Sequence, residues 1–267
     1  MLYGAIYGDI LGSTHEYIGI TGSETAAQLL PPESTFTDDT ILTLAVADAL
    51  INKGDMGKAL RCYATLYPRP MGGYGTRFVS WLEAGDDAVP YRSYGNGSAM
   101  RCCACAYAAD TLEGVLAYAR QSALPTHNHP EGIKGAEATV ACIFLARTGH
   151  TKEEIRQYIH QHYYDMSRTY EELYQEPYKF GAVCQDTVPE AIISFLDSNS
   201  FDEAILYSML TNKDTDTAAA ITGAIAEAFY GIPEYAKTLV REKLDAPLLG
   251  VLDKFEQTYA NDTNTRL

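Results

Sequence analysis

The chain has 267 residues, enough to bury a substantial core as one domain, and 46% of its residues are hydrophobic. A formal net charge of −15 argues against a nucleic-acid backbone or an anionic membrane as the main partner, because both are negatively charged themselves. No stretch reaches the roughly 20 uninterrupted apolar residues of a membrane span, and the N-terminus lacks the basic region of a signal peptide. We therefore expect a cytoplasmic protein without a membrane partner, and the charge leaves room for a small anionic ligand.

The first segment, residues 1–17, has helical character and carries three glycines spaced four apart, Gly4, Gly8 and Gly12. Residues four apart lie on one helix face, and a glycine inside a helix costs roughly 1 kcal/mol relative to alanine. The spacing therefore predicts close packing of this face against a neighbouring helix. Glu16 ends the segment.

An acidic helix start follows at Thr37-Asp38-Asp39-Thr40, ahead of the mostly apolar run 41–50 and a stop at Gly54. A second one, Asp214-Thr215-Asp216-Thr217, precedes the small-residue run 218–230, which stops at Gly231. Carboxylate and hydroxyl oxygens are the ligands that Mg, Mn and Ca ions prefer. Two such starts predict a two-metal site, and the alternative is a pair of ordinary caps, with a carboxylate in solvent at the favourable end of the helix dipole.

Between the acidic starts the pattern predicts helices at about 55–66, 77–83, 100–109, 111–122 and 131–147. Two glycine-rich loops, Gly72-Gly73-Tyr74-Gly75 and Ser93-Tyr94-Gly95-Asn96-Gly97-Ser98, interrupt them, and exposed amides in such loops can hold phosphate groups.

In the interruption before residue 131 we interpret His127 as a hydrogen-bond donor to an anion and His129 as a surface loop residue. Cys102 and Cys105 form a C-x-x-C motif, which we interpret as small buried thiols, with a redox or zinc site as the alternative.

The C-terminal half shows successive capping boxes and no alternating strand pattern. The tyrosine-rich stretch 158–178 predicts a long irregular surface segment. We expect an all-α, single-domain protein over residues 1–260, followed by a flexible tail at 261–267. The boxes are Thr151–Glu154, Thr169–Glu172, Thr187–Glu190 and Ser200–Glu203.

Taken in order, these motifs resemble the ADP-ribosylglycohydrolase family. The resemblance covers most of the chain, residues 4 to 231, and its elements together are specific. They are Gly8-Asp9-x-x-Gly12-Ser13-x-x-Glu16, Thr37-Asp38-Asp39-Thr40, Gly73-Tyr74-Gly75, Ser93-Tyr94-Gly95-Asn96-Gly97-Ser98-Ala99-Met100-Arg101, Thr126-His127 with Gly135-Ala136, and Asp214-Thr215-Asp216-Thr217.

The resemblance implies an orthogonal helical bundle with two Mg²⁺ or Mn²⁺ ions in a central cleft, and hydrolysis of the bond between C1″ of ADP-ribose and an acceptor. Its expected partner is thus ADP-ribose attached to a protein or small molecule, and we expect a monomer. It implies Glu16 and Asp39 as catalytic residues and Asp9 as a structural one. By the same motifs the metal ligands would be Thr37, Asp38, Asp39, Asp214, Asp216 and Thr217, and the substrate contacts Gly73, Ser93, Tyr94, Gly95, Asn96 and His127.

One position departs from the family pattern, because Asn212-Lys213 replaces the usual glycine before the second acidic start. We expect Asn212 to tolerate positive φ there, and Lys213 to turn outward and meet the negative ligand. Two other functions stay open: a different Mg-dependent all-α enzyme, whose usual D-D-x-x-D or His-Asp motifs do not occur, and a non-catalytic ADP-ribose-binding or immunity protein. The acceptor linkage is also open, between arginine, serine, a small guanidine, a nucleobase and others.

Overall fold

The computed structural model describes residues 1–263, and over these residues the protein is all-α, as the sequence predicts. The only β pairing among the described residues is isolated bridges, at Thr37–Met71, Gly95–Val183 and Lys179–Asn212. The helices are α1 (Tyr3–Gly12), α2 (Ala26–Leu29), α3 (Asp38–Asn52), α4 (Met56–Leu66), α5 (Thr76–Glu83), α6 (Gly97–Met100), α7 (Leu112–Ala123), α8 (Pro130–Arg147), α9 (Lys152–His162), α10 (Tyr170–Tyr174), α11 (Cys184–Asp197), α12 (Phe201–Thr211), α13 (Thr215–Tyr230), α14 (Glu234–Lys243) and α15 (Ala246–Thr263), with 3₁₀ helices at Gly85–Asp87 and Cys103–Tyr107.

Helices α1 and α13 form the central pair of the fold, and glycines let them approach closely. A Cβ atom added to Gly8 would lie 2.1 Å from the Ala219 carbonyl oxygen, and one added to Gly12 would lie 2.4 Å from the Asp216 amide nitrogen. Gly4 meets α13 in the same way further along. The predicted packing of the glycine face is therefore confirmed, and its partner is the helix that carries the second acidic start.

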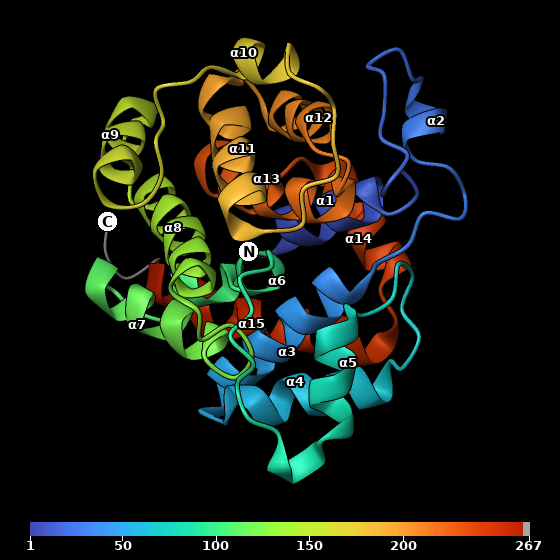
Figure 1. The fold of residues 1–267 in the computed structure, drawn as a ribbon, viewed down its shortest axis with the longest axis vertical. Helices are drawn as coiled ribbons and strands as arrows, with labels where there is room; N and C mark the ends of the chain where they lie inside the picture. Colours follow the sequence, from blue (N-terminus) through green and yellow to red (C-terminus); the bar gives the residue numbers. More distant parts are fainter. Residues whose placement is uncertain (264–267) are drawn as a thin grey trace.

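The other helices fall into two groups, and the α1–α13 pair lies with one of them (Figure 1). Helices α11 and α12 pack against α13, whereas α3 packs against α4 and α15 in the other half. Helix α8 joins the two halves along one side, in contact with α7, α9, α11 and α13. This arrangement brings the N-termini of α3 and α13, which lie 177 residues apart in sequence (Asp38 to Thr215), to one region of the molecule.

Several local predictions need correction. The first helix ends at Gly12 and is followed by turns up to residue 18, whereas we expected it to continue to about residue 17. The helix expected at 100–109 is instead the short helix α6 followed by a 3₁₀ helix. The capping boxes at Thr151 and Thr169 are confirmed. The box at Thr187 is wrong: α11 begins three residues earlier, and the Thr187 hydroxyl donates to the Gly181 carbonyl at 2.7 Å. At Ser200 only the side-chain cap forms, with the Glu203 amide donating at 3.1 Å.

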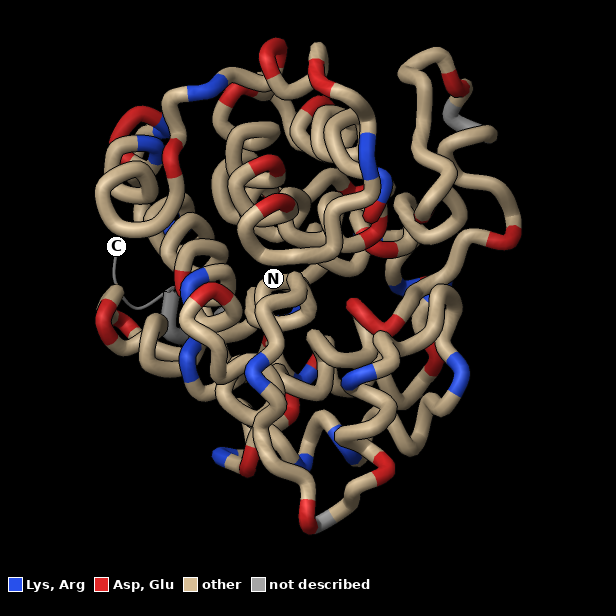
Figure 2. Tube along the Cα trace, viewed as in Figure 1, with Lys and Arg blue, Asp and Glu red and all other residues tan. Residues whose placement is uncertain are grey.

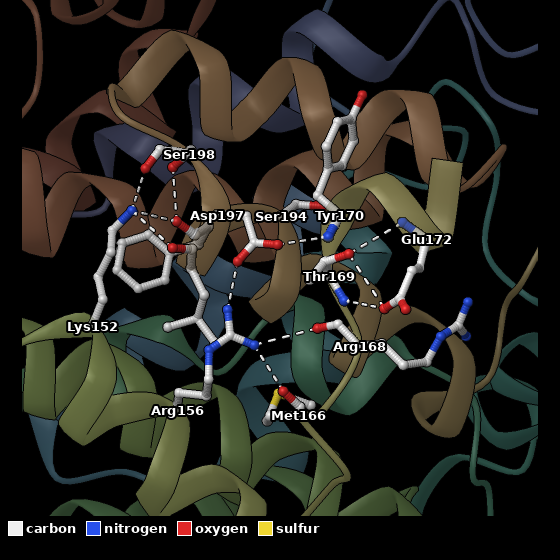
Figure 3. Close-up of polar contacts among 12 residues, drawn as sticks. Lys152, Arg156, Met166, Arg168, Thr169, Tyr170, Glu172, Ser194, Asp197 and Ser198 are labelled. Carbon is white, nitrogen blue, oxygen red and sulfur yellow. Dashed lines mark hydrogen bonds and ion pairs between the residues drawn. The ribbon is translucent and has the colours of Figure 1, made fainter. Parts of the chain in front are cut away.

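The irregular segment after α9 is shorter than expected, because α9 runs to His162 and α10 begins at Tyr170. Figure 3 shows how the segment is held against α11. Arg156 donates to the Met166 carbonyl at 2.7 Å and pairs with Asp197 at 2.5 Å, and Asp197 also accepts from the Tyr170 amide at 2.6 Å. Lys152 donates to the Phe195 carbonyl at 2.8 Å at the end of the same helix.

The cysteine motif is buried in the core. Cys102 and Cys105 are free thiols without solvent exposure, and burial raises the pKa of Cys105 to about 12. Both features fit the predicted buried thiols, because a buried thiol with a high pKa is a poor metal ligand and a poor redox group.

The described helices include none with the length and apolar character needed to cross a membrane. Acidic positions outnumber basic ones, 35 to 20, and lie on most elements of the chain trace (Figure 2). Residues 261–263 belong to α15, whereas 264–267 of the expected tail lie outside the described residues.

Candidate active site

A cleft of about 600 Å³ lies between the N-termini of α3 and α13 and the two glycine-rich loops. Its wall has two parts, one acidic and one made mainly of glycine, basic and other polar residues. The acidic part consists of Glu16, Asp38, Asp39, Asp214 and Asp216, together with Thr217. The other part includes Gly72, Gly73, Gly75, Arg77, Tyr91, Ser93, Gly95, Asn96, Gly97, Arg101 and His127.

The start of α3 is held in place by Asp9, which is fully buried. Asp9 accepts hydrogen bonds from the Thr37 amide at 2.9 Å, the Thr37 hydroxyl at 2.7 Å and the Thr40 amide at 3.1 Å. The Thr37 hydroxyl in turn accepts from the Asp39 amide at 3.1 Å. Asp9 therefore has the structural role expected of it. Thr37 caps the helix, and the cleft lining does not include it, in contrast to the ligand role implied by the family resemblance.

Asp38 and Asp39 follow this cap and line the cleft. Burial, then the charges of Asp9 and other carboxylates, raise the pKa of both groups well above the ordinary value. Oδ2 of Asp39 is buried without a hydrogen-bond partner. An unpaired buried carboxylate oxygen is costly, so this atom is placed where a cation would satisfy it.

The start of α13 presents Asp214, Asp216 and Thr217 opposite α3. Carboxylate oxygens of Glu16, Asp214 and Asp216 lie within 4.8 Å of one another. Burial raises the pKa of Asp214 and Asp216, and the neighbouring carboxylates Asp39 and Asp214 raise that of Asp216 further. Like charges this close in a buried region require either protons or cations between them.

The donor set fits a divalent cation that prefers oxygen. Five carboxylates and the Thr217 hydroxyl line one end of the cleft. The described lining residues include no lysine and no cysteine, and their one histidine, His127, belongs to the opposite side. Such all-oxygen sites suit Mg²⁺ and Mn²⁺. The observation that carries this fit is the orphaned Oδ2 of Asp39.

Glu16 lies beside this acidic end but outside both helix starts. A Cβ added to Gly72, which has φ of +73°, would lie 2.9 Å from Glu16 Oε2, so the loop can pass the carboxylate only because this residue is glycine. Burial is the main cause that raises the pKa of Glu16, and the charge of Asp214 adds to it. The interaction with Glu16 raises the pKa of the Tyr17 hydroxyl to about 12.

The predicted substrate contacts separate into two groups. Gly73, Ser93, Gly95 and His127 line the cleft as expected. Asn96 also reaches it, but its side chain donates to Asp214 at 2.7 Å and to Thr187 at 3.0 Å, so it supports an acidic residue.

Tyr94 differs from expectation. It is 46% exposed, its ring lies 5.2 Å from that of His129, and it is not part of the cleft lining among the described residues. His129 lies in the loop directly before α8, and its ring nitrogen caps that helix by accepting from the Glu131 amide at 3.2 Å.

The cleft also contains aromatic and basic residues to which the sequence assigns no role. Tyr17 and Phe180 stack with ring centroids 4.5 Å apart and an angle of 24° at the acidic end. Arg77 and Arg101 lie on the glycine-rich side. Proximity to Glu16 was the only sequence signal for Tyr17, and Phe180 comes from a segment whose path no local pattern specifies.

The two residues that depart from the family pattern, Asn212 and Lys213, both have partners outside the cleft. Asn212 has φ of −135°, and its side chain accepts from the Gly181 amide at 3.0 Å and donates to Glu190 at 2.9 Å. The tolerance of Asn for positive φ is therefore not used at this position. Lys213 places its ammonium 5.2 Å from the centroid of the Tyr178 ring and is not among the residues that line the cleft, so its expected contact with the ligand stays a prediction.

Comparison with known proteins places this geometry in a family. The family model for ADP-ribosylglycohydrolase matches residues 1–263. The ADP-ribosyl-[dinitrogen reductase] glycohydrolase of Rhodospirillum rubrum is 29% identical over 268 residues, which cover 86% of this chain and 84% of that protein. The human ADP-ribosylhydrolase ARH3 is 27% identical over 310 residues, with coverage of 87% and 85%.

A solved structure agrees with these matches at the level of the fold. A chain of an "ADP-ribosylglycohydrolase-related protein complex" superposes with a TM-score of 0.75 at 22% identity, covering 96% of this chain and 95% of that one. The family match extends over nearly the whole chain and includes every residue of the cleft. The protein therefore belongs to the ADP-ribosylglycohydrolase family and is an enzyme of that type.

Proposed function

We propose that this enzyme hydrolyses the glycosidic bond at C1″ of ADP-ribose attached to a protein side chain or a small acceptor, and releases ADP-ribose. The observation that carries the proposal is the division of the cleft. A carboxylate cluster with an unpaired buried oxygen faces glycine loops, arginines and a neutral histidine across one cavity.

The acidic end is the proposed site of two Mg²⁺ or Mn²⁺ ions, held by Asp38, Asp39, Asp214, Asp216 and Thr217. When bound, such a pair would orient the ribose hydroxyls and lower the pKa of a water molecule. The fully buried side chain of Asp9 would support the ions from behind, because it positions the α3 start through its hydrogen bonds to Thr37 and Thr40.

The proposed role of Glu16 is proton transfer. Cleavage breaks the bond from C1″ to the acceptor and forms one from C1″ to the oxygen of water, through a state with oxocarbenium character. The acceptor leaves with a proton and the water loses one. A carboxyl group with a raised pKa beside the carboxylate cluster can hold that proton between the two events.

The opposite end would bind the diphosphate. Gly73, Ser93 and Gly95 line this end of the cleft, and His127 and Arg77 add side-chain donors on the same side. Anionic oxygens would thus be kept away from the carboxylates, which would place C1″ next to Glu16. We further propose that the enzyme works in the cytoplasm as a monomer. Sedimentation at working concentration would test the monomeric state.

The direct test is a panel of ADP-ribosyl substrates with arginine, serine, guanidine and nucleobase linkages, in Mg²⁺, Mn²⁺ or chelator, read by release of ADP-ribose. We expect metal-dependent release from at least one linkage. Tight binding of ADP-ribose without turnover of any substrate would instead favour a non-catalytic binding protein.

A further inference from the structure

A buried hydrogen-bond relay supports His127 from behind the second glycine-rich loop. Arg101 is 1% exposed, Thr126 is fully buried and His127 is 5% exposed. The Arg101 guanidinium donates to the Ser122 carbonyl at 2.9 Å and to Thr126 Oγ1 at 2.8 Å. Thr126 Oγ1 lies 2.7 Å from His127 Nδ1.

The chemistry of these groups sets a direction for the relay. A guanidinium has donors only, so Thr126 Oγ1 must accept from Arg101. The hydrogen bonds of Thr126 Oγ1 are those with Arg101 and with His127 Nδ1, so accepting from Arg101 leaves the hydroxyl proton for the second partner. The hydroxyl proton of Thr126, made more acidic by the adjacent guanidinium, is then directed to Nδ1, which accepts it.

The environment of His127 makes the position of its proton important. Burial, followed by the charges of Arg101 and Arg77, lowers the pKa of His127 well below its ordinary value. The ring is therefore neutral at pH 7 and carries one N–H group. With Nδ1 as the acceptor, that group is at Nε2.

Nε2 is the ring nitrogen at the cleft wall. A Cβ added to Gly97 would lie 3.4 Å from Nε2 and one added to Gly95 would lie 3.8 Å from it. Both residues line the cleft together with His127. The loop therefore leaves open the side of the ring from which Nε2 can reach a ligand.

We infer that Arg101 and Thr126 are positioning residues that fix His127 as the Nε2–H tautomer, so that the neutral imidazole donates a hydrogen bond to an anionic oxygen of the ligand. The identity of that oxygen, on the diphosphate of ADP-ribose, rests on the proposed function. The tautomer itself does not.

The first test measures the tautomer in the free protein. The ¹⁵N shifts of histidine-labelled enzyme at pH 7, with the His127 signals identified by their loss in His127→Gln, should show a protonated Nε2 and an unprotonated Nδ1. Thr126→Val should move both shifts toward those of a tautomer mixture, and Thr126→Ser should retain the original values. A protonated Nδ1 in the native enzyme overturns the inference, whether or not any variant folds.

The second test measures binding by calorimetry, with ADP-ribose and ADP as probes. Thr126→Val should weaken the affinity for both on the order of 10-fold, the usual effect of losing a hydrogen bond to a charged group. Thr126→Ser should restore it. The matched control is Thr139→Val, which removes a buried hydroxyl that donates to the Gly135 carbonyl at 3.0 Å outside the relay.

The two tests separate this inference from the proposed function. If the native enzyme binds neither probe, the proposed function fails while the shifts still decide the tautomer. If Thr126→Val weakens binding without changing the His127 shifts, or to no greater extent than Thr139→Val, the positioning role is overturned.

Discussion

At the scale of single residues, the site depends on carboxylates kept in a region that disfavours their charge. Asp39 and Asp216 are almost fully buried, and burial together with neighbouring carboxylates raises the pKa of both. Such an arrangement is unfavourable by itself and becomes favourable when cations compensate the charge. Functional chemistry and local instability therefore reside in the same side chains.

Asp39→Asn should abolish metal-dependent turnover. It replaces a charged ligand by a neutral amide that binds a hard cation more weakly, at the residue whose Oδ2 lacks a partner. Hydrolysis assays over a Mn²⁺ titration would measure the loss. Asp48→Asn, on the same helix but outside the cleft lining, is the control and should leave the metal requirement unchanged. Full activity of Asp39→Asn at native metal concentrations would contradict the ligand role.

Glu16→Gln should lower kcat by a factor on the order of 10²–10⁴, the usual range for losing a general acid or base. The affinity for ADP-ribose should change much less, because Glu16 lies in the acidic part of the cleft and the diphosphate is proposed to bind at the glycine-rich loops. Single-turnover kinetics and calorimetry on the same preparation would separate the two effects. Parallel losses in rate and affinity would make Glu16 a binding residue instead.

At the scale of helices, the packing of α1 against α13 determines where the second acidic start lies. Gly12 touches the backbone of Asp216, so a side chain at this position cannot fit without moving the end of α13. The same helix is linked at its other end, where the Gly4 amide donates to Glu227 at 2.7 Å. A helix pair fixed at both ends is a rigid support for the carboxylates at the start of α13.

Gly12→Ala should reduce turnover and metal affinity together, since its Cβ would lie 2.4 Å from the Asp216 amide nitrogen. Thermal unfolding should also occur at a lower temperature. The control is Gly250→Ala in α15, where nothing lies within 4 Å of the added Cβ and the higher helix propensity of alanine favours folding. Native metal affinity in Gly12→Ala would show that α13 can shift without disturbing its ligands.

At the scale of the whole molecule, the clustered carboxylates link metal binding to stability. Burial raises the pKa of Asp9 to about 6, and burial with neighbouring charges raises those of Asp38 and Asp216 well above 3.8. A pKa raised on folding means that the folded state binds more protons than the unfolded chain. Stability from these groups is thus complete below pH 3.8 and is lost as the pH rises through the raised values.

Metal should therefore stabilise the protein more at high pH. We expect the difference in Tm between Mn²⁺-saturated and chelator-treated enzyme to be larger at pH 8 than at pH 5, since the carboxylates are then ionised and need compensation. Asp216→Asn should reduce the difference at pH 8. Scanning calorimetry provides the measurement, and a difference that is constant or shrinks with pH would contradict this linkage.

The local sequence determined the parts of this protein that depend on neighbouring residues. Alternation between apolar runs and caps predicted most of the helices, and the acidic starts at 37–40 and 214–217 predicted where carboxylates would gather. The glycines of the first helix predicted a close helix partner. Where these predictions succeeded, as at the Thr151 and Thr169 caps and the glycine face of α1, the signal lies within a few residues.

Only the tertiary structure decided which side chains face the cleft. Thr37 and Asn96 carry suitable groups, but Asp9 engages the first and Asp214 the second across more than 25 residues of chain. Lys213 lies over Tyr178, and Phe180 reaches the cleft from an irregular segment. The direction of a side chain in a loop is set by long-range partners, and sequence patterns of a few residues contain no record of those partners.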